Sequence, residues 1–199
     1  MKAPECGMVH NAEVYGLEES IRAAKFPMAV DVSKITTELT PGIKALAQSP
    51  IGEGHDNALL GIVVQFDLTA TNKFWVEMER YHFADIISSQ STMHRITKFD
   101  LDKSYISYVD PRMIEIMKEK IAEYNDSSPD RKQYLYLGIL YSNPAGFRLT
   151  ARMTTNYRQL KTIYRQRKEH RLPEWKCLCR WIESLPMSEL ITGETEHAL

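Results

Sequence analysis

Two clusters of polar side chains, far apart along the chain, combine the residue types that bind anionic or planar ligands. The first follows a long apolar segment, and its polar members are Gln90, His94, Arg95, Lys103 and Ser104. A guanidinium group binds phosphate or carbonyl oxygens, and an imidazole ring stacks on a ring system or hydrogen-bonds to it. Taken alone, an adjacent histidine and arginine are more often part of a surface salt bridge than of a binding site.

The second cluster begins at Asn156, where a strand pattern changes to a helix pattern. The free N–H groups at such a helix start favour an anion near Asn156 and Arg158, but simple capping by Asn156 explains the residue equally well. Arg167 falls in line with the apolar residues Leu160 and Ile163, so its charge needs a partner. We expect the two clusters to meet at one nucleotide-binding site.

The sequence gives little support for a nucleophilic, metal-binding or classical nucleotide-binding motif. His55 follows a glycine in a loop, and a lone histidine is usually structural or solvated. No Ser-His-Asp or Cys-His arrangement, no metal-binding spacing, no GxGxxG fingerprint and no P-loop is visible. The three cysteines, Cys6, Cys177 and Cys179, form an odd and sparse set that does not indicate a disulfide framework.

The composition is that of an ordinary globular protein. The chain has 199 residues, of which 43% are hydrophobic and 26% charged, and its net charge is −1. This balance gives no reason to expect a nucleic-acid polymer or an anionic membrane as partner, and no apolar run reaches the ~18 residues of a transmembrane helix. We expect one domain in the cytoplasm.

Periodicity and turn residues predict a mixture of strands and helices. We expect helices over 16–25, over 40–47, from 110 to about 124, from 157 and from 172, and strands over 28–32, 60–69 and 147–155. Residues 74–87 fit a strand or a helix, and the tail after Pro186 is expected to be peripheral. Because strands and helices do not alternate regularly, the pattern favours an α+β fold over a doubly wound sheet.

Together, these pieces resemble the flavin-dependent thymidylate synthase family, the ThyX type, over roughly residues 54–185. Gly54-His55 resembles the family's Gly-His loop, and residues 90–95 resemble its Gln-x-x-Arg-His-Arg signature. Residues 156–160 and Arg167 resemble its Asn-x-Arg-x-Leu motif and downstream arginine. The resemblance implies one ThyX-like α+β domain over 1–199, with a mixed or antiparallel sheet and flanking helices. Its parts would be an N-terminal region 1–53, a core 54–185 and a tail 186–199.

The resemblance also implies an activity and a set of ligands. The chain would methylate dUMP, or a related pyrimidine nucleotide, with methylenetetrahydrofolate and reduced FAD, and NADPH would reduce the flavin. It would form a homotetramer with shared active sites and need no metal. The implied contacts to FAD are His55, His94, Arg95, Asn156 and Arg158. The implied contacts to the nucleotide are Gln90, Lys103, Ser104 and Arg167, with Arg167 as the catalytic residue that favours the ionised uracil ring.

Several positions depart from the family pattern. Met93 replaces the first arginine of the signature, and Leu101 falls at the glutamate position unless a one-residue shift puts Asp102 there. Tyr105 replaces the arginine that would bind the dUMP phosphate, and Leu140 replaces another arginine. Each charged hydrogen bond lost should cost about 1.5–3 kcal/mol of binding.

Two lysines are candidates to replace the missing charge, and two alternative functions stay open. Lys98 and Lys103 are the candidates to replace the missing charge. The first alternative is a diverged protein of this fold that binds flavin or nucleotide without synthase activity. The second is a structural or partner-binding protein on an unrelated α+β fold.

Overall fold

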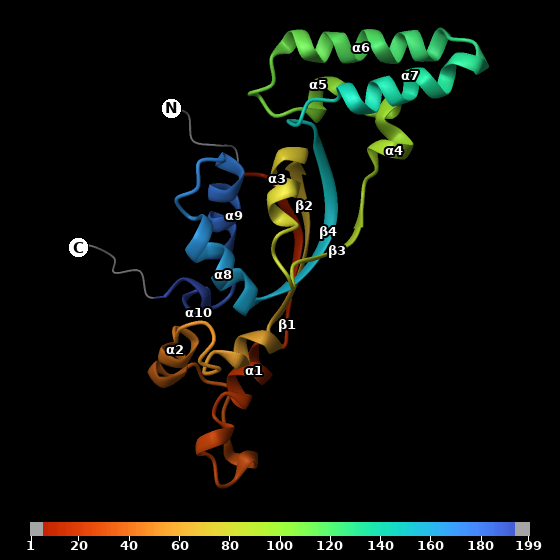
Figure 1. Cartoon of the computed structure of the whole chain (residues 1–199). Coiled ribbons are helices and arrows are strands. Elements are labelled where there is room, and N and C mark those ends of the chain that lie inside the picture. Colours follow the sequence, from red (N-terminus) through yellow and green to blue (C-terminus); the bar gives the residue numbers. More distant parts are fainter. Residues whose placement is uncertain (1–5, 194–199) are drawn as a thin grey trace. The chain divides into compact units, whose positions relative to one another are not determined.

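The structure is a computed structural model that describes residues 6–193 (Figure 1). The chain divides into two compact units. In the described part of the chain, unit 1 consists of residues up to 68, 79–87 and from 152 onwards, and unit 2 consists of residues 69–78 and 88–151. The single domain expected from the sequence stays a prediction.

The elements mix helices and strands, as the α+β prediction requires. In chain order they are β1 (Val9–Tyr15), α1 (Leu17–Ala23), α2 (Pro41–Ala47), β2 (Val63–Thr71), α3 (Asn72–Met78), β3 (Asp85–Ser89), α4 (Thr92–Arg95), α5 (Leu101–Ser104), α6 (Pro111–Asp126), α7 (Pro129–Ser142), β4 (Arg148–Asn156), α8 (Tyr157–Arg167), α9 (Pro173–Glu183) and α10 (Glu189–Thr192). Four 3-10 helices add Phe26–Met28, Val32–Lys34, Asn57–Gly61 and Ile96–Lys98. The strands form one sheet in the order β1-β2-β4-β3.

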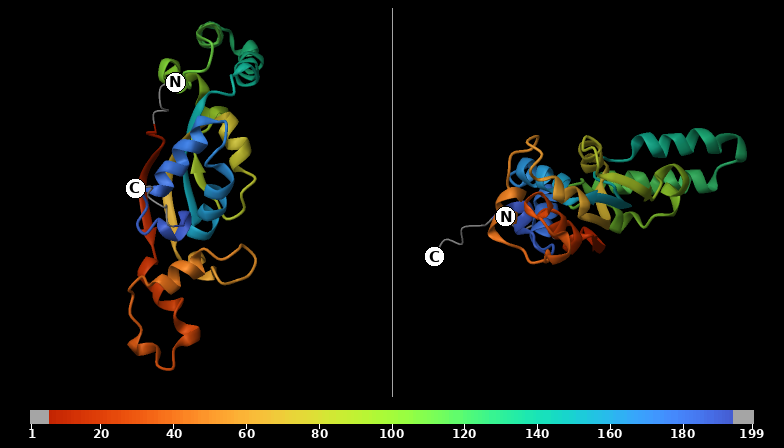
Figure 2. Two further views of the ribbon diagram at one scale, coloured as in Figure 1. Left: turned by 90° about the vertical axis from the view of Figure 1, so that its left-hand side faces the viewer. Right: turned by 90° about the horizontal axis from the view of Figure 1, so that it is seen from below.

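The core of unit 1 is built on β2. Val64, Phe66 and Leu68 alternate along this strand and are fully buried, which confirms the strand and the inward face predicted from the sequence. The helices α8 and α9 lie side by side in this unit (Figure 2). Both are amphipathic, and α9 buries Trp175, as predicted.

Strand β1 was not predicted, and it pairs antiparallel with β2. The register shifts between His10 and Glu13, where Asn11 takes a left-handed backbone conformation with φ of 49°. The amide of Asn11 donates a hydrogen bond of 2.6 Å to Asp67. Asparagine is among the few residues that tolerate this conformation, so the irregularity is locally stabilised.

Unit 2 contains the antiparallel helices α6 and α7 and a core centred on Phe147. The ring of Phe147 is fully buried and meets the rings of Phe99 and Tyr105 edge-on, with centroids 5.1 and 5.2 Å apart. Such edge-to-face pairs add stability beyond burial alone.

The predicted helix starts at two prolines are confirmed. Thr40 accepts a hydrogen bond from the Ile43 N–H at the start of α2, and Asp110 accepts one from the Arg112 N–H at the start of α6. In both helices proline follows the cap, where its missing N–H costs nothing.

Two local predictions are wrong. The strand expected over 28–32 is absent, since two 3-10 helices flank this segment and Met28 and Val30 are almost fully exposed. The alternation there has no neighbouring strand to pair with. The tail is not wholly peripheral, because Leu190 and Ile191 in α10 are buried and α10 packs on α8.

The prediction about the cysteines is also wrong in part. Cys6 and Cys177 form a disulfide, 171 residues apart in sequence, and Cys179 is a buried thiol whose pKa burial raises to about 12. Disulfides are rare in proteins kept in a reducing cytosol, and the cytoplasmic location stays a prediction. Within residues 6–193 no helix is long and apolar enough to span a membrane.

We predict that Phe147→Ala destabilises the protein by about 3–5 kcal/mol, because it removes a fully buried ring and leaves a cavity. Urea unfolding followed by circular dichroism measures the change. Tyr141→Ala is the matched control, since Tyr141 is 88% exposed and its loss should stay within about 0.5 kcal/mol. Equal losses for the two variants would contradict the assignment of Phe147 to the core.

Candidate functional site

Arg167, at the end of α8, is held between two aromatic rings of unit 1. Its guanidinium carbon lies 4.7 Å from the ring centre of Trp175 and 5.4 Å from that of Tyr81. Its Nε donates a hydrogen bond of 2.6 Å to the Tyr81 hydroxyl, which in turn donates one of 2.9 Å to Gln166. Aromatic side chains are therefore among the partners that the sequence required for Arg167. A guanidinium fixed in this way keeps its orientation, as the stabilisation of a developing negative charge requires.

The segment that supplies Tyr81 is the turn between α3 and β3, and sequence reasoning missed it. Phe83 has φ of 63°, a strained conformation for a bulky residue. The buried Thr155 hydroxyl donates a hydrogen bond of 2.8 Å to the Phe83 carbonyl oxygen and helps to hold the turn. The apolar pattern of residues 74–87 fitted either a strand or a helix, so it did not indicate the contact between Tyr81 and Arg167.

A buried charge cluster is built from two basic residues of α8 and one acidic residue from the loop before β2. Lys161 is completely buried, and its ammonium group donates to Asp56 at 2.8 Å and to the carbonyl oxygens of Ala47 and Ser49 at 2.7 Å each. Asp56 is also buried, and its second oxygen lies 3.0 Å from Nε of Arg158. Burial lowers the pKa of Lys161, and the hydrogen bond to Asp56 opposes this.

This cluster changes the interpretation of two predicted cofactor contacts. Arg158 already has a buried carboxylate as its partner. The Asn156 side chain accepts a hydrogen bond of 2.9 Å from the Gln159 N–H, so it acts as the helix cap that was the alternative reading. Neither contact excludes a ligand, and the role of both residues in cofactor binding stays a prediction.

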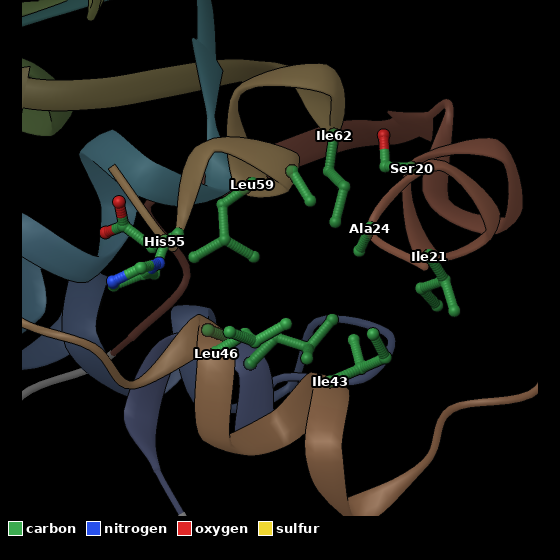
Figure 3. Close-up of a pocket in the computed structure, with 12 residues that line it drawn as sticks. Ser20, Ile21, Ala24, Ile43, Leu46, His55, Leu59 and Ile62 are labelled. Carbon is green, nitrogen blue, oxygen red and sulfur yellow. The ribbon is translucent and has the colours of Figure 1, made fainter. Parts of the chain in front are cut away.

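His55, beside Asp56, lines a small and mostly apolar cavity of unit 1. Figure 3 shows His55 and Ser20 on opposite sides of this cavity, with Leu59 and Ile62 along its wall. Its volume of about 20 Å³ is close to what one water molecule needs and far below that of a cofactor. The contact of His55 with a flavin stays a prediction.

In unit 2, Gln90 is fixed against β4. Its backbone N–H donates to the Thr150 carbonyl oxygen, and its side-chain oxygen accepts from the Thr150 N–H, both at 2.9 Å. Gln90 opens onto a surface hollow of about 380 Å³, which we call the glutamine hollow. Its lining residues are Gln90, Ser91, Arg95, Lys98, Phe99 and Asp100.

The other predicted residues of unit 2 lie around this hollow or beside it. Lys103 is mostly exposed and forms an ion pair of 2.8 Å with Asp100, while the Ser104 hydroxyl donates to the Asp100 carbonyl oxygen. Of the two lysines considered as replacements, Lys98 lines the hollow and Lys103 does not.

The predicted residues therefore fall into two groups. Unit 1 contains His55, Asn156, Arg158 and Arg167, and unit 2 contains Gln90, His94, Arg95, Lys103 and Ser104. A single site formed from both groups stays a prediction. No cluster of three or more His, Cys, Asp or Glu side chains suited to a metal ion occurs in the described residues.

The fold is similar to that of flavin-dependent thymidylate synthases. The ThyX enzyme of Helicobacter pylori, solved with FAD and dUMP, superposes with a TM-score of 0.69 at 12% identity, covering 94% of this chain and 98% of that one. A second structure of ThyX from this organism with FAD and dUMP gives a TM-score of 0.67 at 11% identity, covering 93% and 98%. The UMP/dUMP methylase PolB of Streptomyces cacaoi, bound with 5-Br dUMP, gives 0.60 at 14% identity, covering 89% and 87%.

These likenesses establish the fold, and the predicted ThyX-like α+β architecture is confirmed. Comparison at the level of sequence adds nothing to them. No protein-family profile matches the chain, and no curated protein sequence matches it either.

We predict that Lys161→Met destabilises the protein by about 3–5 kcal/mol, because it leaves Asp56 as a buried carboxylate with one cation fewer. Chemical unfolding measures the change. Lys168→Met, an exposed position on the end of the same helix, is the control and should cost less than about 0.5 kcal/mol. A loss below about 1 kcal/mol at Lys161 would mean that Arg158 alone compensates Asp56.

Proposed function

We propose that this protein is a flavin-dependent thymidylate synthase-like enzyme that methylates dUMP or a related pyrimidine nucleotide. The observation that carries the proposal is the fold similarity over nearly the whole length of both chains to enzymes solved with FAD and dUMP. Following the family resemblance, we further propose NADPH as the reductant of the flavin and a homotetramer with shared sites.

Arg167 is the proposed catalytic residue. A guanidinium held between Tyr81 and Trp175 would favour the ionised form of the uracil ring, because its positive charge is fixed in place before the reaction begins. The side-chain NH₂ of Gln90 would donate to a uracil carbonyl oxygen, since the side-chain oxygen of this residue already accepts a hydrogen bond from Thr150.

The residues present suit a flavin dinucleotide. Its pyrophosphate requires cations, and the exposed side chains of His94 and Arg95 form no ion pair with any described residue. His94, Arg95, His55, Asn156 and Arg158 would hold the cofactor. When bound and reduced, FAD would supply the hydride and methylenetetrahydrofolate the one-carbon unit. The chain's own task would be to orient the nucleotide and to exclude water.

The residues expected to bind the nucleotide phosphate are those that differ most from the family pattern. Tyr105, at the position where an arginine is expected, is buried, and its hydroxyl donates a hydrogen bond of 2.8 Å to Asn143. Burial raises its pKa to about 12. Leu140, at a second expected arginine, packs against the core of unit 2. We propose that Lys98 and Arg95, which line the glutamine hollow, bind the phosphate, with Lys103 and Ser104 near its edge.

The same observation favours the second candidate function, a diverged protein that binds flavin or nucleotide without synthase activity. The side chains at both substituted positions pack in or against the core of unit 2. The absence of the two arginines is therefore a change of packing as well as of charge. The two candidates predict the same cofactor and differ in nucleotide affinity and in product.

We predict that the purified chain, loaded with FAD, oxidises NADPH in a dUMP-dependent reaction and forms dTMP. Arg167→Lys should reduce kcat by about 100-fold or more and leave the flavin absorbance bands in place, because it removes the fixed planar donor but keeps the charge. Arg165→Lys, at an exposed position on the same helix, is the control and should retain activity.

The outcomes separate the two candidates. Calorimetry with dUMP accompanies the assay. Flavin and dUMP binding without any methylated product would support the diverged protein. A colourless protein that binds neither ligand would overturn both candidates.

A further inference from the structure

The disulfide of unit 1 joins one exposed cysteine to one buried cysteine. Cys6 lies in the exposed segment before β1, whereas Cys177 lies within α9 and is only 3% exposed. A thiol from solution can therefore reach one sulfur of this bond and not the other. Exchange between thiols and disulfides requires access to the sulfur that is attacked, so the bond is open to this chemistry at Cys6.

A cation lies beside the exposed sulfur. Arg180 follows Cys177 by three residues on α9, and its guanidinium donates a hydrogen bond of 3.6 Å to Sγ of Cys6. A neighbouring positive charge favours the thiolate form of a cysteine and makes its sulfur a better leaving group. The contact therefore favours opening of the bond, because the attraction is strongest once the Cys6 sulfur carries a negative charge.

The segment that holds Cys6 can leave α9 while the sheet stays intact. Gly7 follows Cys6, is exposed, and has no atom within 4 Å of the position that a Cβ would take, apart from its chain neighbours. In the described part of the chain the first buried side chain is Met8, and the pairing of β1 with β2 begins at Val9. Opening the disulfide therefore releases a short exposed segment and leaves the contacts of β1 in place.

The third cysteine does not take part in this exchange. Cys179 is 3% exposed, and burial raises the pKa of its thiol to about 12, so it stays protonated and unreactive at neutral pH. It follows Cys177 by two residues on the helix, a spacing at which side chains do not face each other. The reactive pair therefore consists of Cys6 and Cys177.

We propose that Cys6 and Cys177 form a redox-active pair that exchanges with low-molecular-weight thiols and disulfides of the glutathione type, with Cys6 as the reactive residue. In reduction, a thiolate from solution attacks Sγ of Cys6 and forms a mixed disulfide, and Cys177 leaves as a thiolate and takes up a proton. A second thiolate attacks the sulfur of the first thiol molecule, and Cys6 leaves as the thiolate beside Arg180. Two thiols thereby lose two electrons and become one disulfide, and the protein disulfide gains them.

The reverse sequence makes Cys6 a site of reversible modification. A disulfide from solution transfers one half to the Cys6 thiolate and releases the other half as a thiolate. Cys177, whose Cα lies 4.9 Å from that of Cys6, then displaces the bound half and restores the protein disulfide. This chemistry goes beyond the proposed function, because it uses neither the flavin nor the nucleotide.

Equilibration of the full chain in glutathione redox buffers tests the proposal, with the reduced fraction measured by acid quenching and alkylation. We expect both forms to be populated, whereas structural disulfides resist reduction by glutathione. Arg180→Gln should lower the equilibrium constant for reduction about 3- to 5-fold, because the Cys6 thiolate loses its cation. Lys176→Gln is the matched control, since it removes one exposed positive charge from the same helix, and it should change the constant by less than about 1.5-fold. A bond that stays oxidised in every buffer, or equal shifts for the two variants, would overturn the proposal.

Two cysteine variants identify the residue that reacts. After reduction and treatment with oxidised glutathione, Cys177→Ala should keep glutathione on Cys6, because no partner thiol displaces it. Cys6→Ser should take up none in the native state, because Cys177 and Cys179 are buried. Mass spectrometry of the intact protein measures the adducts. An adduct on Cys6→Ser, or none on a folded Cys177→Ala, would contradict the assignment of Cys6, and the Arg180 comparison decides the proposal even where Cys177→Ala does not fold.

Discussion

The ion pairs of the buried Asp56 carboxylate with Lys161 and Arg158 are the interactions on which the predicted site residues of unit 1 depend. Lys161 uses all three of its donors, on Asp56 and on the carbonyl oxygens of Ala47 and Ser49, so its charge is buried without an unsatisfied proton. The second oxygen of Asp56 lies against Arg158. One acidic side chain thereby connects the end of α2, the loop that contains His55, and helix α8. Such a cluster is costly to bury and is tolerated because its opposite charges compensate one another, although Oδ1 of Asp56 accepts no hydrogen bond from the described residues.

The two units use charge in different ways. In unit 1 the basic residues of α8 are engaged by the protein itself, Lys161 and Arg158 by Asp56, and Arg167 by Tyr81 and Trp175. In unit 2, Arg95 and Lys98 beside the glutamine hollow are exposed and have no acidic partner among the described residues. The first arrangement positions groups with fixed geometry, and the second attracts anions from solution. The proposed function needs both.

Local patterns in the sequence predicted the elements whose signals are local. The alternation from Ile62 to Leu68 identified β2, and Thr40 and Asp110 with the prolines that follow them marked two helix starts. Strand β1 carries little alternation because most of its residues are exposed, so no hydrophobic pattern revealed it. The apparent strand at 28–32 failed for the opposite reason, since its apolar residues alternate but have nothing to pair with.

The candidate site could be predicted only in its residue types. The need of Arg167 for a partner followed from its place on an apolar stripe, but the identity of the partner did not, because Tyr81 is 86 residues away. The cap at Asn156 was foreseen as one of two interpretations, whereas no local pattern in the sequence indicated that Asp56 and Lys161 form a buried pair. The disulfide between Cys6 and Cys177 was missed because pairing across 171 residues leaves no local spacing to recognise.

The proposed function requires the nucleotide phosphate to be bound by other residues than the two arginines expected from the family resemblance. Arginine at position 105 or 140 would disturb the core around Phe147, because the side chains of Tyr105 and Leu140 pack there. The proposed phosphate contact therefore has to come from a surface element, and the end of α4 and the 3-10 helix after it supply Arg95 and Lys98, which line the glutamine hollow. Exposed lysine and arginine side chains hold an anion less rigidly than buried arginines do, since more side-chain freedom is lost on binding. We therefore expect the nucleotide affinity, rather than the cofactor affinity, to distinguish this chain from the enzymes that share its fold.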